Sequence, residues 1–132
     1  MHLLDTNALI ILLFGNITLG KLSKETLNTI KTSNRIHISI VSLWEMAIKM
    51  KLGKLKITYS IAEIEEECIN EGIEIIPIKA AHLDMLNEIP YLSDHKDPFD
   101  RMIMAVALSE GMTLISTDEK IRRPEYGLSV IW

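Results

Sequence analysis

Four acidic side chains stand where a predicted strand passes into a predicted helix, and together they could hold a divalent cation. Asp5 follows the short segment 2–4, and Glu45 lies in the first helical turn after a predicted strand. Asp100 is the third residue of another predicted helix, and Asp118 directly follows a later strand. The carboxyl ends of parallel strands share one edge of a sheet, where ligands bind, so we expect these carboxylates to converge there.

Each of these acids also has an ordinary structural explanation. Asp5, Asp100 and Asp118 could each stabilise the start of a helix, and Glu45 could close a capping box with Ser42. Such caps are common and contribute about 1 kcal/mol, so capping is the better explanation for any one acid alone. Four carboxylates at one place repel one another, however, and that repulsion predicts a cation among them.

The expected ligand set favours Mg²⁺ or Mn²⁺ over zinc, because it offers carboxylate oxygens without a cysteine or histidine cluster. Such an ion lowers the pKa of a bound water and neutralises charge that develops on a phosphate. This chemistry suits hydrolysis of a phosphodiester bond. The chain has neither a glycine-rich phosphate loop nor the nucleophile elbow of serine hydrolases, so no other reaction competes well.

Other polar residues near the acids have less specific expectations. His95 and Lys96 precede a predicted helix and are candidates for touching a substrate. Asp97 is expected to be the N-cap of that helix rather than a direct ligand. His37, in a predicted strand, is expected to be structural, whereas His82, on a predicted helix, is expected to be exposed.

The elements that must position the acids follow from the spacing of apolar residues. Strands are predicted at 2–4, 35–40, 73–76, 112–116 and 128–132. Helices are predicted at 6–14, 23–32 with an end at Ser33 and Asn34, 42–52, 60–72, 79–88, 98–110 and 118–123. This order predicts an α/β fold, a three-layer α/β/α sandwich with a central, mostly parallel sheet.

The composition predicts a single domain over residues 1–132 that buries apolar surface against a partner. The hydrophobic fraction is 48% and the mean hydropathy is +0.19, and the segment 8–14 is apolar on every side of its helix. The formal net charge of −4 argues against a general nucleic-acid coat protein, but it allows an enzyme with a local basic patch. The single cysteine, Cys68, and an apolar run far below the ~20 residues of a membrane span predict a cytoplasmic protein without an internal disulfide.

Four segments in this order resemble PIN-domain ribonucleases of the VapC toxin type. They are LLDTNALI at 3–10, SLWEMAIK at 42–49, HKDPFDRMIMAVAL at 95–108 and TLISTDEKI at 113–121. The resemblance implies a parallel sheet between helices and a Mg²⁺- or Mn²⁺-dependent endoribonuclease, the toxin of a type II toxin–antitoxin pair. By position, the family's catalytic and metal-binding quartet corresponds to Asp5, Glu45, Asp100 and Asp118.

The same resemblance implies accessory residues and partners. Thr6, Asp97 and Thr117 are the accessory candidates, which could hold water or orient carboxylates. A homodimer and a small antitoxin, whose tail covers the active site, are the implied protein partners. The candidates for holding RNA phosphates are Lys49, Lys96 and Arg101, together with other cations at 51–56, 122 and 123, and each is equally explained as an ordinary surface cation.

Two further classes of protein remain as alternatives. A receiver-like module that accepts a phosphoryl group on an aspartate usually has two adjacent acids after its first strand and a lysine after its last strand. Here Asp5 is followed by Thr6, and the chain ends at Trp132 without such a lysine. An interaction protein that has lost catalysis is disfavoured because the acidic quartet is intact.

Overall fold

The central sheet is parallel throughout and has its first strand in the middle. In the computed structural model, which describes residues 1–33 and 35–132, five strands form one sheet in the order β3-β2-β1-β4-β5. Every neighbouring pair runs parallel, and Leu3 is in register with both His37 and Leu114. The strands are β1 (His2–Leu4), β2 (Ile36–Ser39), β3 (Ile73–Ile76), β4 (Thr113–Ile115) and β5 (Val130–Ile131).

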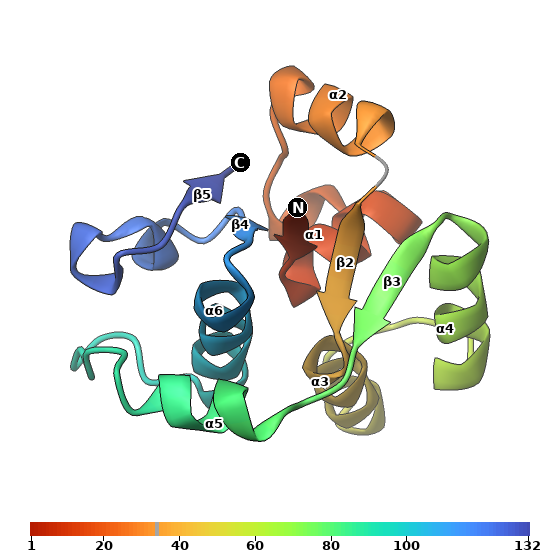
Figure 1. Ribbon diagram of the computed structural model, residues 1–132. Helices are drawn as coiled ribbons and strands as arrows, with labels where there is room; N and C mark the ends of the chain where they lie inside the picture. The colour runs from red at the N-terminus through yellow and green to blue at the C-terminus, as the bar shows by residue number, and fades with distance from the viewer. Residues whose placement is uncertain (34) are drawn as a thin grey trace.

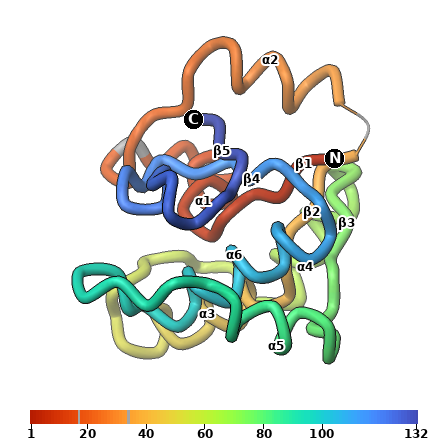
Figure 2. The backbone as a smooth tube through the Cα atoms, turned by 60° about the vertical axis from the view of Figure 1, so that its left-hand side comes forward, coloured from red at the N-terminus to blue at the C-terminus, as the bar shows by residue number. Residues whose placement is uncertain are grey.

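Helices cover both faces of this sheet, which confirms the predicted α/β architecture (Figures 1 and 2). The α-helices are α1 (Thr6–Phe14), α2 (Lys24–Thr32), α3 (Ile40–Lys51), α4 (Ile61–Asn70), α5 (Ala80–Leu86) and α6 (Pro98–Glu110). Short 3₁₀ helices are η1 (Ile17–Leu19), η2 (Glu119–Arg122) and η3 (Pro124–Tyr126). Figure 2 shows α2 on one side of the sheet and α5 and α6 on the other.

Adjacent strand residues supply two separate cores because successive side chains point to opposite faces. Leu3 and Leu114 pack in the core that contains the buried length of α6. Leu4 and Ile115 pack in the other core, with side chains from α1 and α4. Cys68 is fully buried in this second core, as a small apolar residue. Burial on both faces fixes the register of the strands whose ends carry the acids.

The start of α3 differs from the prediction. Ser39, the last residue of β2, has an extended backbone, and its hydroxyl accepts a hydrogen bond from the Val41 amide at 3.1 Å. The helix therefore begins at Ile40, and the predicted capping box between Ser42 and Glu45 is wrong. Apolar β-branched residues at 40 and 41 fit a strand or a buried helix equally well by periodicity. As a result Glu45 lies in the second helical turn and has no capping role.

Two other expectations concern the exposure of His82 and the end of α2. The prediction that His82 is exposed is wrong, because α5 packs on α6 and buries the imidazole completely. Its Nε2 lies 2.7 Å from Glu110 Oε1, and its Nδ1 accepts from the Lys79 amide at 3.1 Å. The predicted helix end at 33–34 is confirmed at Ser33, the C-cap of α2, whereas Asn34 lies outside the described residues. No helix in the described parts of the chain is long and apolar enough to cross a membrane.

Candidate metal centre

Asp5 lies at the carboxyl end of β1, in the centre of the sheet. Its amide donates to the Ile115 carbonyl of the neighbouring β4 at 3.0 Å, which continues the sheet one residue beyond the strand. Its carboxylate accepts from the Ala8 amide at 2.7 Å, so the residue does cap α1. The side chain is nonetheless buried, and its pKa is raised to about 7, mainly because burial disfavours the ionised form. A contact with the Ser116 hydroxyl opposes that rise of the pKa, and the charges of Asp100 and Asp118 add to it.

Asp100 enters the same region from the first turn of α6. Asp97 is the N-cap of this helix, as predicted, and accepts from the Asp100 amide at 3.0 Å, with Pro98 at the first helical position. Because Asp97 supplies the cap, the Asp100 carboxylate is free to point into the site. The pKa of Asp100 is raised to about 6, mainly by burial and then by the charges of Asp97 and Glu45, against a hydrogen bond from His95 that lowers it.

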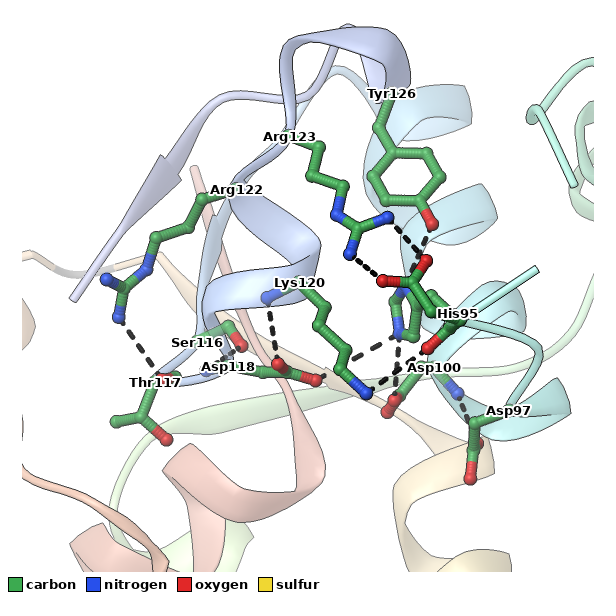
Figure 3. A network of polar contacts seen from close by, with 11 residues as sticks. His95, Asp97, Asp100, Ser116, Thr117, Asp118, Lys120, Arg122, Arg123 and Tyr126 are labelled. Carbon is green, nitrogen blue, oxygen red and sulfur yellow. Dashed lines mark hydrogen bonds and ion pairs between the residues drawn. The ribbon is translucent and has the colours of Figure 1, made fainter. Parts of the chain in front are cut away.

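Asp118 completes the group from the loop after β4. One of its carboxylate oxygens accepts from the Lys120 amide at 2.9 Å, and the other lies 4.0 Å from Nε2 of His95. The same Nε2 lies 3.2 Å from Asp100 Oδ2, and Tyr126 contacts the opposite side of the ring (Figure 3). One ligand atom from each of His95, Asp100 and Asp118 lies within 4.8 Å of the other two.

Glu45 faces this group from α3 but is held by two other side chains. The Thr6 hydroxyl donates to Glu45 Oε1 at 2.6 Å, and the Lys49 ammonium lies 2.5 Å from Oε2. Thr6 also lies 3.0 Å from the buried Ser42 hydroxyl, which fixes its position. The carboxylate of Glu45 is therefore held in place near Asp100 and paired with the Lys49 ammonium. Its charge still raises the pKa of Asp100.

Two predicted residues have other tasks. The hydroxyl of Thr117 donates to the Leu19 carbonyl at 3.0 Å, so its partner is the segment before α2 and not an acid. In Figure 3 the Arg122 guanidinium contacts the backbone carbonyl of Thr117. Arg101 is buried, and its guanidinium donates to the Pro90 and Ile89 carbonyls at 2.9 and 3.1 Å. A buried guanidinium with backbone partners cannot reach a phosphate at the surface. In this structure both side chains therefore have partners within the fold.

The lysines differ in their freedom to contact RNA. Lys49 is engaged by Glu45, whereas Lys96 is exposed beside the site, with its ammonium 5.9 Å from the centre of the Tyr91 ring. The sequence indicates only a possible substrate contact for His95 and gives no functional signal for Tyr126. The single signal for His95 is its place in a polar loop five residues before Asp100.

These side chains fit a hard divalent cation. Asp100 and Asp118 come together from two separate segments, and the charges of both raise the pKa of the buried Asp5, which comes from a third. Burial and mutual repulsion oppose ionisation of these carboxyls, and a cation bound among them would remove both costs. Their oxygens are the donors that Mg²⁺ and Mn²⁺ prefer.

Comparison with known proteins identifies related folds. Residues 2–125 match the PIN domain family. No curated protein matches the chain significantly. Among solved structures, VapBC2 from Rickettsia felis, bound to a DNA fragment from its promoter, has a TM-score of 0.66 at 19% identity, covering 98% of this chain and 96% of that one.

Two other complexes contain chains of the same fold. FitAcB from Neisseria gonorrhoeae has a TM-score of 0.63 at 14% identity, covering 100% of this chain and 97% of that one. A toxin–antitoxin complex from Klebsiella pneumoniae has a TM-score of 0.60 at 20% identity, with coverage of 100% and 97%. At these identities the comparisons establish the fold.

Proposed function

The chain belongs to the PIN domain family, whose members are typically metal-dependent nucleases, and from this premise we propose that it is a Mg²⁺- or Mn²⁺-dependent endoribonuclease. The observation that carries the proposal is the approach of Asp100 and Asp118 to each other and to His95, with one ligand atom of each within 4.8 Å of the other two. The buried carboxylate of Asp5, at the carboxyl end of β1, lies near enough for the charges of both acids to raise its pKa. Three helix or loop starts could each use an acid as a cap without bringing the acids together. Their shared location is explained by a common ligand.

The chain's own residues would divide the work as follows. Asp5, Asp100 and Asp118 would hold the ion, which supplies an activated water and neutralises charge on the scissile phosphate when it is bound. Glu45, kept in place by Thr6 and Lys49, would complete the negative wall of the site beside Asp100. The ionised forms of these acids, rather than the protonated ones, would bind the ion.

We further propose that the protein acts as the toxin of a type II toxin–antitoxin pair, with a small cognate antitoxin and a second copy of itself as partners. The structural neighbours in VapBC, FitAB and toxin–antitoxin complexes support this proposal. Large apolar side chains on the surface are available for such contacts. They include Trp44, Leu52, Tyr59, Ile69 and Leu83. The receiver-like alternative has no support from the family match.

Cleavage of RNA by the purified protein tests the nuclease proposal. We expect cleavage of single-stranded regions with Mg²⁺ or Mn²⁺ and none with EDTA. Asp5→Asn and Asp100→Asn should each lower the rate at least about 100-fold, because each removes an anionic ligand. Asp84→Asn, at an exposed position on α5, is the matched control and should cleave normally. Undiminished cleavage by both site variants would contradict the proposed mechanism.

A further inference from the structure

The imidazole of His95 is placed as if it belonged to the metal centre. We propose that His95 Nε2 is a direct ligand of the divalent ion, so that the centre contains nitrogen as well as oxygen donors. This inference rests on the proposed function, because it concerns the same site. It changes the expected chemistry of the site, because the sequence predicted oxygen ligands alone.

The distances suit a shared ion. Nε2 of His95 lies 3.2 Å from Asp100 Oδ2 and 4.0 Å from Asp118 Oδ2. Two ligands that are each ~2.1 Å from one cation lie about 3 Å apart at a right angle and about 4 Å apart on opposite sides. The observed separations fall in this interval, so an ion could bind all three atoms after small side-chain movements.

A hydrogen bond between His95 and Asp100 explains the positions of these three side chains less completely than a shared cation does. The nitrogen and two carboxylate oxygens converge, and the two carboxylates repel each other. A proton on Nε2 could form a hydrogen bond with Asp100 Oδ2 at 3.2 Å. Asp118 Oδ2, at 4.0 Å from Nε2, is beyond hydrogen-bonding distance. A divalent cation would satisfy the nitrogen and both carboxylates together.

The other ring nitrogen is held in a way that presents Nε2 to the site. Nδ1 of His95 lies 2.9 Å from the Tyr126 hydroxyl, and both side chains are buried. In metal-binding histidines a hydrogen bond at the second nitrogen fixes the tautomer and the orientation of the ring. Figure 3 shows Nε2 directed towards Asp100 and Asp118. When an ion is bound, Nδ1–H would donate to the Tyr126 oxygen and the lone pair of Nε2 would face the ion.

The loop that carries His95 is also fastened from outside. The carboxylate of Asp94 accepts two hydrogen bonds from the Arg123 guanidinium, and the Lys120 ammonium donates to the Asp94 carbonyl at 3.2 Å. These contacts attach residues 94–95 to η2 and η3, the segment that follows Asp118. His95 and Asp118 are therefore held relative to each other, as two ligands of one ion need to be.

Nitrogen coordination can be seen directly by pulsed electron paramagnetic resonance of the full chain loaded with Mn²⁺ and free of RNA. We expect coupling of the manganese spin to ¹⁴N. Protein labelled with ¹⁵N only in histidine should show the ¹⁵N pattern instead. This comparison needs no substitution, so it remains informative even if a variant fails to fold. Mn²⁺ bound without nitrogen coupling would overturn the inference.

Variants assign the nitrogen to His95. His95→Gln should lose the coupling and weaken Mn²⁺ binding at least about tenfold. His95→Asp should recover binding through oxygen but show no coupling, and it should reduce the preference for Mn²⁺ over Mg²⁺, because imidazole suits the transition metal better. His37→Gln is the control and should keep the coupling, since His37 pairs with Glu74 in the sheet.

The outcomes separate this inference from the proposed function. If wild-type protein cleaved RNA but its bound manganese showed no nitrogen coupling, the nuclease proposal would stand and His95 would be ruled out as a ligand. Coupling that persists in His95→Gln would also reject His95 as the ligand. If wild-type protein bound no Mn²⁺ at all, both the inference and the metal-dependent function would fall.

Discussion

Asp5 is expected to make the metal-free protein less stable as the pH rises. Burial raises its pKa from 3.8 to about 7, so between these values the folded chain keeps a proton that the unfolded chain has lost. The stability contributed at low pH is therefore lost as the pH increases from 4 to beyond 7. The full difference between these two pKa values corresponds to a decrease of about 4 kcal/mol in the free energy of unfolding.

Chemical denaturation in EDTA at several pH values measures this effect. Asp5→Asn is the control, because the amide oxygen can still accept from the Ala8 amide but carries no charge. The variant should become more stable than wild type as the pH rises, while its RNA cleavage is lost. If the difference in unfolding free energy between Asp5→Asn and wild type were the same at pH 4 and at pH 8, the expectation would be refuted.

Arg101 is expected to stabilise the fold rather than to bind RNA. Its guanidinium donates to the carbonyls of Ile89 and Pro90 and lies over the Tyr91 ring, 4.6 Å from its centre. Arg101→Ala leaves these buried carbonyls without a partner and should lower the unfolding free energy by about 2 kcal/mol, measured by denaturation. Lys96→Ala, at an exposed position, should leave stability unchanged. Equal stability of the two variants would contradict this assignment.

At the scale of residues, the sequence predicts which acids converge but not how each neighbour points. Asp5, Asp100 and Asp118 follow from strand ends and helix starts, which are visible in the order of residues. The roles of Arg101 and Thr117 depend on which carbonyl lies within reach after folding. The position of His95 depends on Tyr126, 31 residues away in the chain, and no local pattern links the two.

The helix α3 offers a test at the scale of elements, because its observed cap differs from the predicted one. Ser39→Ala should lower the unfolding free energy by about 1 kcal/mol, since the Val41 amide loses its partner. Hydrogen exchange of that amide should accelerate. Ser42→Ala is the matched control, which removes a hydroxyl near Thr6 and should leave exchange at Val41 unchanged. Unchanged exchange at Val41 in the Ser39 variant, together with faster exchange of the Glu45 amide in the Ser42 variant, would instead support the original capping box.

Most elements could be predicted within two or three residues because their ends carry strong local signals. Asp97 and Pro98 define the start of α6, and Gly111, at φ 66°, defines its end. The passage from β2 into α3 lacks such a signal, since the residues at 36, 38, 40 and 41 are all apolar and β-branched. There the tertiary packing of Val41 decides where the strand ends and the helix begins.

At the scale of the whole molecule, the strand order explains why distant acids meet. β1 lies between β2 and β4, so the chain reverses its direction of travel across the sheet beside β1. Ligands of open α/β sheets bind at such a reversal, outside the carboxyl ends of the strands. Asp5 follows β1 and Asp118 follows β4, so the two acids come from neighbouring strands. Right-handed crossovers made this convergence predictable without coordinates.

With a net charge of −4, the RNA binding proposed above would depend on local attraction rather than on the charge of the whole molecule. The logarithm of the binding constant for a single-stranded oligonucleotide should fall with the logarithm of salt concentration, with a slope of about −0.7 for each phosphate contacted. Few cations lie free beside the acids, because Lys49 is paired with Glu45 and Arg101 is buried. We therefore expect a shallow slope, corresponding to about one to three phosphate contacts.

Lys96 should account for one of those contacts, because it is exposed and adjacent to His95. In an Asp100→Asn background that does not cleave, Lys96→Ala should weaken binding and make the slope shallower by about 0.7. Lys24→Ala, an exposed lysine at the start of α2, removes the same charge at a distance from the site and should leave the slope unchanged. If both lysine variants changed the slope equally, attraction would come from overall charge, and the local basic contact would be rejected.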